Sequence, residues 1–431
     1  MTTLRLFSTV VSVLLSLTAL AQEGAWTGKI DVQGMSLPLV FNFSPDGCTL
    51  DSPAQGAKGI KAEKTVTAEG KLRVTVAAIG VTFEGVMEED SIKGQFMQGG
   101  QSLPLTLRKG QMQMRRPQTP ASPFPYTTEE VSVANGNIVL SGTLTLPPNS
   151  NSNTPVVLMV TGSGQQNRDE EIFGHRPFAV LADALARHGI ASLRYDDRGY
   201  GNAALDFTSF TTDDFKNDAE AAIRHLRKRF SRVGVIGHSE GGTIALMLAA
   251  EGKADYVVAL AAMAVSGLQT LLSQHRASLA QAFLPITVLD TYCAELSVAF
   301  GKLANGARVE DIDTGNVPAV LREHFTKVLQ QTSSPYMRHL LTIDVRPILP
   351  KIACPVLAMG GKKDTQVDCE TNLSALHAGL SACRHTILPF DGLNHLFQHC
   401  TTGNYTEYQQ IEETMSVEVM DKICLWINDI R

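Results

Sequence analysis

The pentapeptide at residues 237–241 is the part of the sequence best suited to chemistry. It reads Gly-His-Ser-Glu-Gly, with Ser239 at its centre. An apolar run at 233–236 precedes it, and a second apolar run at 242–250 follows it. This order predicts a strand, a sharp turn and a helix, because small neighbours let the backbone turn tightly enough to expose the serine hydroxyl above the end of a sheet. We therefore predict that Ser239 is a nucleophile.

Two loops farther along the chain offer the groups that would activate this serine. A serine hydroxyl is a weak nucleophile at neutral pH, so it needs a base to take its proton and an acid to orient that base. Asp364 follows the apolar run 355–359, and His395 follows the run 385–388. Both lie just past predicted parallel strands, where open sheets place their sites. We predict that His395 is the general base and that Asp364 holds its imidazole.

These assignments have alternatives. Asp364 could instead cap a helix, and Asp368 or Asp391 could then supply the acid. His395 and His399 are four residues apart and could be drawn as a metal pair, but no third ligand is suitably spaced. We therefore expect no metal and no cofactor.

Attack on a carbonyl creates an oxyanion, which needs hydrogen-bond donors held in place. The backbone N–H of Glu240, directly after the nucleophile, is one expected donor. The second is expected in the glycine-rich stretch 161–164, which follows the apolar run 156–160, and the N–H of Ser163 is best placed. A simple glycine-rich turn is the alternative for this stretch.

The segments that must position these groups alternate between strands and helices. Continuous apolar strands are predicted at 156–160, 190–194, 233–236, 256–261, 355–359 and 385–388, with helices at 177–188 and 213–230. This alternation predicts a mostly parallel sheet covered by helices on both faces. Residues 265–353 are predicted to be helical with no strand, and we expect them to form a cap that shapes substrate access.

The region before this sheet has a different rhythm. From residue 22 to about residue 110, short segments of alternating polarity are separated by glycines and by clusters of Asp, Asn and Ser, which predicts a small all-β domain, either a sandwich or a barrel. Residues 111–125 contain four prolines and are predicted to be a semi-rigid linker. The catalytic domain would then occupy 126–431 and open with a hairpin around Asn135 and Gly136.

Residues 1–21 have the pattern of a secretory signal peptide. Arg5 precedes an apolar stretch at 6–20 that is shorter than the roughly 20 residues needed to span a bilayer, and small residues lie where a signal peptidase cleaves. We expect cleavage after Ala21 and export to the periplasm or the medium. No cysteine follows the apolar stretch to carry a lipid, so we expect no stable membrane anchor.

The composition excludes other functional classes. The chain has 431 residues, of which 44% are hydrophobic and 19% charged, so it can bury a sizeable core in two domains. A net charge of −6 gives no basic excess, and we expect no nucleic-acid partner. Seven cysteines leave at least one thiol unpaired in a monomer; buried free thiols are one alternative and a bridge among Cys369, Cys383 and Cys400 is the other. The composition specifies no oligomeric state.

Several motifs together carry a family resemblance. They are Gly162-Ser-Gly164 with Arg168-Asp169, the stretch Tyr-Asp-Asp-Arg-Gly-Tyr-Gly at 195–201, the serine pentapeptide, Ser334-Pro-Tyr336, Gly361-Lys-Lys-Asp364 and Asn394-His395. With these motifs the chain resembles secreted bacterial α/β-hydrolases of the carboxylesterase type, related to prolyl oligopeptidases and dienelactone hydrolases, in which a small β-domain precedes the catalytic domain. The order Ser239, Asp364, His395 is the one expected of that fold.

The resemblance implies a serine carboxylesterase that hydrolyses short to medium acyl esters, small molecules, through an acyl-enzyme. It also implies that Asp197, Arg198, Gly199 and Gly201 structurally support the loop at residues 161–171, which we call the oxyanion loop. The remaining candidates are Tyr200, Tyr336 and Met337, which could line the substrate pocket or belong to the core.

Two other functions stay open. One is an exported serine peptidase or amidase with the same triad, for which Glu170 and Glu171 are the nearby candidates to anchor a substrate amino terminus. The other is a binding protein that uses the fold without turnover.

Overall fold

The computed structural model describes residues 23–32, 35–45, 47–52, 57–67, 71–110, 115–202, 206–280, 282 and 284–430. The chain forms two compact units, Met1–Arg115 and Arg116–Arg431, each with its own apolar core. The predicted signal peptide and residues 111–114 of the predicted linker lie outside the described residues. Among the residues described, no helix has both the length and the apolar character needed to cross a bilayer.

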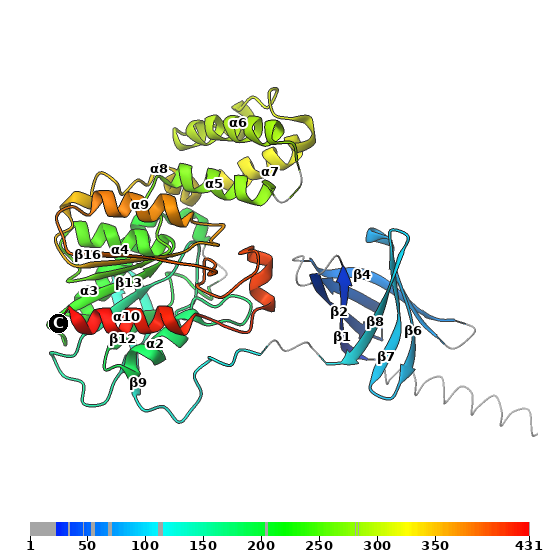
Figure 1. Ribbon diagram of the computed structural model, residues 1–431, viewed down its shortest axis with the longest axis horizontal. Coiled ribbons are helices and arrows are strands. Elements are labelled where there is room, and N and C mark those ends of the chain that lie inside the picture. Colours follow the sequence, from blue (N-terminus) through cyan, green and yellow to red (C-terminus); the bar gives the residue numbers. More distant parts are fainter. Residues whose placement is uncertain are drawn as a thin grey trace, which may run out of the picture. The chain divides into compact units, whose positions relative to one another are not determined.

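The first unit is a closed antiparallel barrel of eight strands (Figure 1). The strands are β1 (Gly24–Val32), β2 (Met35–Ser44), β3 (Gly47–Ser52), β4 (Ala57–Val66), β5 (Leu72–Val76), β6 (Val81–Glu88), β7 (Ser91–Gln98) and β8 (Gln101–Lys109). Each strand pairs with the next, and β1 pairs with β8 to close the ring. Alternate residues point inward, and large side chains such as Trp26, Phe41 and Phe83 fill the interior. This unit confirms the predicted all-β domain and decides between the two expected forms in favour of a barrel.

The second unit is built on an eight-stranded sheet in the order β16-β15-β14-β13-β11-β12-β10-β9. Its strands are β9 (Thr127–Asn135), β10 (Ile138–Leu146), β11 (Val156–Val160), β12 (Ala191–Tyr195), β13 (Val233–His238), β14 (Val257–Leu260), β15 (Val356–Gly361) and β16 (His385–Phe390). The strands from β11 to β16 are parallel, and β9 and β10 form the predicted antiparallel hairpin at one edge. The sheet therefore confirms the predicted α/β class.

Helices cover both faces of this sheet (Figure 1). One face packs against α2 (Pro177–Arg187) and α10 (Val417–Asp429). The opposite face packs against α3 (Thr212–Leu226), α4 (Glu240–Ala250) and α9 (Cys369–Gly379). The central parallel strands β11, β13, β14 and β15 are buried along their whole length, which agrees with the continuous apolar runs in the sequence, whereas the edge strand β16 is only partly buried.

Helix α3 illustrates how the sequence specifies one of these elements. Its first turn carries a capping box between Thr211 and Asp214. The apolar face then recurs at helical spacing, from Phe215 through Ala219 and Ile223, and is buried against the sheet.

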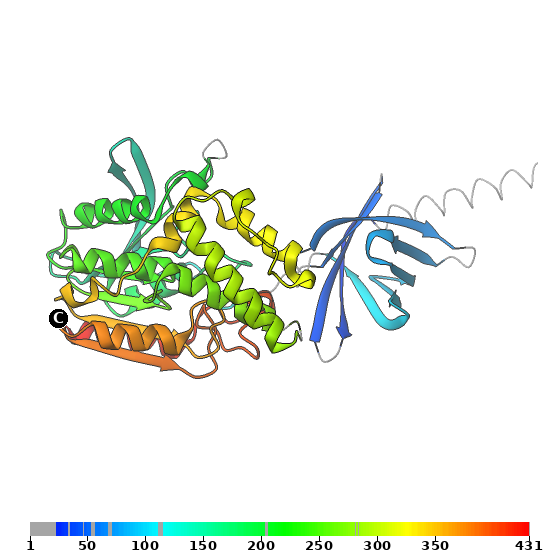
Figure 2. The same ribbon diagram turned by 90° about the horizontal axis from the view of Figure 1, so that it is seen from above.

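The insertion between β14 and β15 is helical, as predicted. It contains α5 (Gly267–Ala280), α6 (Ile286–Ala304), α7 (Arg322–Thr332) and α8 (Pro335–Thr342). These helices share an apolar cluster of their own around Tyr292, Phe300 and Phe325, and they lie on the side of the molecule that carries α4 and α9 (Figures 1 and 2).

Short 3-10 helices complete the secondary structure of the residues described. They are η2 (Ala77–Ile79), η3 (Phe207–Ser209), η4 (Val309–Asp311), η5 (Ala319–Leu321), η6 (Leu349–Lys351) and η7 (Tyr405–Gln410).

The proline-rich segment forms no helix or strand in its described part, 115–125. It is nevertheless attached to the second unit. The Arg116 guanidinium donates hydrogen bonds to the carbonyl oxygens of Phe173, Gln409 and Ile411 at 2.8–3.0 Å. Gln118 bridges to the backbone near Met415. From Arg116 onward the segment thus belongs to the second unit.

All seven cysteines are free thiols, and Cys48, Cys293, Cys369 and Cys424 are buried. The bridge considered among Cys369, Cys383 and Cys400 is therefore not formed. Burial raises the pKa of the Cys369 thiol to about 11, so this thiol is protonated at neutral pH.

Candidate active site

Ser239 lies at a sharp turn between the last residue of β13 and the first residue of α4. Its backbone adopts φ 54° and ψ −120°, a conformation that costs a non-glycine residue on the order of 1–3 kcal/mol. The flanking glycines are required by space: a Cβ on Gly237 would lie 2.0 Å from the Gly241 carbonyl oxygen, and one on Gly241 would lie 2.1 Å from that of Val160. The turn therefore holds the serine in a strained, half-buried position at the carboxyl end of a central strand.

His395 and Asp364 meet in the loops that follow β16 and β15. The His395 Nδ1 atom lies 2.6 Å from Asp364 Oδ2, and both side chains are buried. Asp364 Oδ1 accepts backbone hydrogen bonds from Gln366 at 2.7 Å and Val367 at 2.9 Å, which fix the orientation of the carboxylate. Because Nδ1 faces a carboxylate, it carries the proton and Nε2 is the ring nitrogen that can act as a base.

The competing acids have other partners. Asp368 caps α9 by accepting a hydrogen bond from the Thr371 N–H at 2.8 Å. Asp391 has an 88% exposed side chain and forms an ion pair with Lys362 at 2.9 Å. Neither occupies the place next to the imidazole of His395, which Asp364 takes.

His399 does not pair with His395 as a metal ligand. Its ring is exposed and lies 2.9 Å from a Glu413 carboxylate oxygen. Across the described part of the chain, no group of three or more His, Cys, Asp or Glu side chains is arranged to hold a metal ion.

The glycine-rich stretch after β11 lies against the nucleophile, since a Cβ on Gly162 would be 3.3 Å from Ser239 Cβ. The Gly162 N–H donates to Glu170 Oε1 at 2.7 Å, and the Gly164 N–H donates to the Tyr336 hydroxyl at 3.0 Å. Within the described residues, the N–H groups of Ser163 and Glu240 donate no hydrogen bond. The two donors expected from the sequence are therefore available to a ligand.

The loop after β12 supports this stretch. Asp197 accepts hydrogen bonds from the Gln166 N–H at 2.8 Å and from the Thr161 hydroxyl at 3.1 Å. Burial raises the pKa of Asp197 well above its ordinary value, although these two hydrogen bonds oppose the shift. Arg198 is held in turn by the Asp218 carboxylate at 2.7 Å.

Two glycines let this loop turn, because Gly199 and Gly201 adopt positive φ angles of 72° and 76°. Asp197 thus contacts residues 161 and 166 directly, and the structural role expected of the four loop residues stays a prediction.

The comparisons with known proteins bear on this arrangement. The family model described as serine aminopeptidase, S33, matches residues 175–399, more than half of the chain. The chain belongs to the serine aminopeptidase S33 family. This membership confirms the predicted serine hydrolase and the α/β-hydrolase resemblance. The matched residues include Ser239, Asp364 and His395.

Individual relatives of this S33 family member are more distant. Over 295 residues it is 28% identical to esterase EstD from Thermotoga maritima, an alignment that covers 67% of this chain and 65% of that esterase. The chain thus spans just under two thirds of that relative's length. Among solved structures, Est1E from Butyrivibrio proteoclasticus aligns at 16% identity and TM-score 0.40, covering 70% of this chain and 99% of Est1E. Proline iminopeptidase from Mycobacterium smegmatis aligns at 16% identity and TM-score 0.43, covering 70% and 98%.

The three candidate pocket residues of this S33 member lie in different places. Tyr200 is 47% exposed. Met337 is half-buried, between the core of the sheet and that of the cap. Tyr336 is buried, with its hydroxyl between the Gly164 N–H and the Glu240 carboxylate. Its burial favours the second of the two alternatives, a residue of the core.

Glu240 contributes a side chain whose role the sequence did not reveal. Its carboxylate is buried and accepts hydrogen bonds from the Thr212 hydroxyl at 2.7 Å and from Tyr336. Burial raises the pKa of Glu240, and these hydrogen bonds oppose the shift. The sequence offered one signal for a buried, hydrogen-bonded carboxylate here: Glu240 is the only charged residue of the otherwise apolar segment that forms α4.

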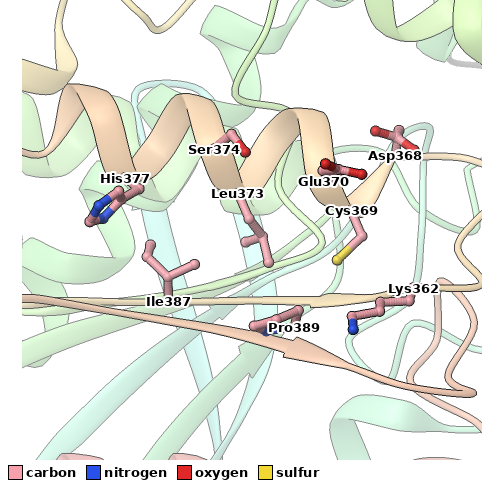
Figure 3. A pocket seen from close by; sticks show the side chains of 9 residues that line it. All are labelled: Lys362, Asp368, Cys369, Glu370, Leu373, Ser374, His377, Ile387 and Pro389. Atoms are coloured by element: carbon pink, nitrogen blue, oxygen red, sulfur yellow. The ribbon is translucent and has the colours of Figure 1, made fainter.

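A separate hollow of about 830 Å³ lies between α9 and β16 (Figure 3). Leu373 from α9 points toward Ile387 and Pro389 of β16, His377 lies at one end of the hollow, and Lys362 and Asp368 lie at the other (Figure 3). None of the three candidate triad residues lines it, so this groove at the edge of the sheet is distinct from the catalytic arrangement of the S33 member.

Proposed function

We propose that this chain is a serine carboxylesterase that hydrolyses short to medium acyl esters through Ser239, His395 and Asp364. The observation that carries the proposal is the 2.6 Å contact between His395 and Asp364, in loops at the same sheet edge as a serine held in a strained turn. The esterase name of the Thermotoga maritima relative supports it.

In this mechanism Ser239 attacks the ester carbonyl while His395 Nε2 takes its proton. Asp364 stabilises the imidazolium that forms. The N–H groups of Ser163 and Glu240 bind the oxyanion, and each such donor contributes on the order of 3 kcal/mol to lowering the barrier. Glu240 is also the first residue of α4, so the helix dipole favours negative charge at this point. His395 then protonates the leaving alkoxide, and water releases the acyl group by the reverse sequence.

The peptidase alternative requires an acid that can receive the amino terminus of a substrate. Glu170 is buried and already accepts hydrogen bonds from Gly162 and His238. Glu171 forms an ion pair with Arg176 at 3.0 Å. Because both acids of this loop have partners within the protein, the arrangement favours an ester over a peptide amino terminus.

A series of p-nitrophenyl esters from acetate to decanoate, assayed beside amino-acid p-nitroanilides, tests this proposal. We expect ester turnover that depends on acyl length, little anilide turnover, and loss of both in Ser239→Ala. Faster anilide turnover would make the protein a peptidase. Silence on all substrates from folded protein would favour the binding-protein alternative.

We also propose that the protein is exported after cleavage following Ala21. The support is the charged, apolar and small-residue pattern of residues 1–21. N-terminal sequencing of the native protein should begin at Gln22, and an intact Met1 on a cytoplasmic protein would contradict export.

A further inference from the structure

A second histidine lies directly before the nucleophile and is buried beside the candidate base. His238 is the last residue of β13, and its ring centroid is 4.6 Å from that of His395. The proposed mechanism gives this residue no role. It nevertheless contacts Glu170 of the oxyanion loop and the backbone of His395, and it directly precedes Ser239.

Both ring nitrogens of His238 face oxygen acceptors. Nδ1 lies 2.9 Å from Glu170 Oε1, and Nε2 lies 2.9 Å from the backbone carbonyl oxygen of His395. A carbonyl oxygen can only accept a hydrogen bond, and Glu170 Oε1 already accepts one from the Gly162 N–H at 2.7 Å. An ionised Glu170 carboxylate can likewise only accept, so both nitrogens of His238 donate and the ring is a doubly protonated imidazolium.

The surroundings support a charged ring. Burial by itself would lower the pKa of His238, but the charge and hydrogen bond of Glu170, the His395 carbonyl and the Asp364 charge together raise it. The titratable groups that face the ring are Glu170 from the oxyanion loop, His395 from the loop after β16 and Asp364 from the loop after β15. A buried carboxylate and a buried imidazolium in contact satisfy each other's charge.

Glu170 is held in an unusual conformation to make this contact. It is buried, and its φ of 54° is in the left-handed region, which a residue other than glycine rarely adopts. Such a conformation persists where the surrounding structure holds it. Here the Glu170 N–H donates to the Asn167 carbonyl oxygen at 2.9 Å, and the side chain contacts Gly162 and His238.

We propose that His238 is a positioning residue which, as a buried imidazolium, fixes the oxyanion loop and the loop of the catalytic base relative to Ser239. The inference deepens the proposed esterase function and rests on it. His238 is covalently joined to Ser239. Through Glu170 it contacts Gly162, the neighbour of Ser163, and through the His395 carbonyl oxygen it contacts the backbone of the catalytic base. Because a displacement of about 1 Å in a reacting group can cost about 100-fold in rate, loss of either connection should reduce kcat.

Two substitutions separate the two connections. In His238→Asn the side-chain amide can replace Nδ1 and keep a donor for Glu170, whereas in His238→Gln it can replace Nε2 and keep a donor for the His395 carbonyl. With a short-chain p-nitrophenyl ester, we expect each to lower kcat on the order of 10-fold to 100-fold with KM changed much less. The matched control is His399→Gln, whose ring is exposed, with kcat unchanged.

A third variant tests the charge itself. Glu170→Gln keeps an oxygen that can accept from Gly162 and His238 but removes the negative charge that raises the pKa of His238. The imidazolium then loses its proton at lower pH, so kcat should fall as the pH rises, at pH values where the wild type stays constant. Glu171→Gln, the neighbouring exposed acid, should keep the wild-type profile. Wild-type kcat and pH profile in folded Glu170→Gln would overturn the proposal.

Nitrogen NMR of the histidine side chains measures their protonation state in the wild type, so this test does not depend on whether a variant folds. We expect one buried histidine to remain doubly protonated at about pH 8, well above the ordinary histidine pKa of about 6.5. If every buried imidazole is singly protonated there, the proposal is wrong. Failure of the esterase function itself is distinguished by Ser239→Ala: if that variant retains ester turnover, the triad assignment has failed, whereas the protonation state of His238 is measured independently.

Discussion

The carboxylate of Asp364 is bound on both of its oxygens, and this arrangement makes its role specific. One oxygen faces the imidazole of His395 at 2.6 Å, and the other accepts two backbone N–H groups. An amide in this position could keep the backbone hydrogen bonds through its oxygen, but it would present an N–H to the imidazole and favour the wrong tautomer.

We therefore predict that Asp364→Asn lowers kcat on the order of 10⁴-fold, as the equivalent change does in other serine hydrolase triads, while the fold is retained. Steady-state kinetics and thermal unfolding check this. Asp391→Asn is the matched control, because Asp391 is exposed and pairs only with Lys362 in the described structure. Equal activity of the two variants would remove Asp364 from the triad.

The candidate triad residues could be predicted from the sequence because each one lies just past a predicted strand. Ser239, Asp364 and His395 each follow an apolar run, and the structure brings the last two into contact. The sequence could not predict the side-chain partners of Glu240 and His238, because these depend on residues that are distant in sequence, such as Tyr336 and Glu170. The sequence consequently left two alternatives for Tyr336, the substrate pocket and the core.

At the scale of elements, α8 connects the cap to the oxyanion loop. Its Tyr336 hydroxyl accepts from the Gly164 N–H at 3.0 Å and donates to the Glu240 carboxylate. Of the two residues expected to bind the oxyanion, Ser163 is thus the neighbour of Gly164 in this network, and Glu240 is itself a member of it. The cap helices share their own apolar cluster, so a movement of this cluster would reach the site through α8.

We predict that Tyr336→Phe destabilises the protein by about 1–3 kcal/mol, because the buried Glu240 carboxylate loses a donor. Loosening of the oxyanion loop should also lower kcat on the order of 10-fold. Chemical denaturation and ester kinetics measure the two effects. Tyr405→Phe, at a ring that is 48% exposed, should change neither. A Tyr336→Phe variant with wild-type stability and kcat would contradict the role given to α8.

Periodicity predicted most elements because their burial is local in sequence. The strands and the helical insertion followed from apolar runs, and the β9–β10 hairpin followed from Asn135 and Gly136. Closure of the barrel could not be predicted in this way, since it depends on the pairing of β1 with β8 across the whole unit. Similarly, nothing local in the proline-rich segment revealed that Arg116 binds carbonyls almost 300 residues away.

The whole molecule consists of two units with separate cores, and every residue assigned to the reaction lies in the second. The barrel interior is filled by its own side chains. The catalytic unit has a complete sheet, both helical layers and the cap, so it has the elements that an independent domain requires.

We predict that a protein comprising residues 116–431 folds and hydrolyses esters within about two-fold of the wild-type kcat. A protein comprising residues 126–431 lacks the hydrogen bonds of Arg116 and Gln118 and should unfold several degrees lower, at similar kcat. Calorimetry and ester kinetics on both fragments check this. Loss of activity in the longer, folded fragment would show that the barrel contributes to catalysis.

The most direct test of the account is covalent labelling of the nucleophile. Folded wild-type protein and Ser239→Ala are incubated with a fluorophosphonate, and the labelled peptide is mapped by mass spectrometry. We predict a single adduct on Ser239 in the wild type, loss of ester turnover in proportion to labelling, and no adduct in Ser239→Ala. An adduct on another residue, or ester turnover by Ser239→Ala at the wild-type rate, would contradict the assignment of Ser239 as the nucleophile.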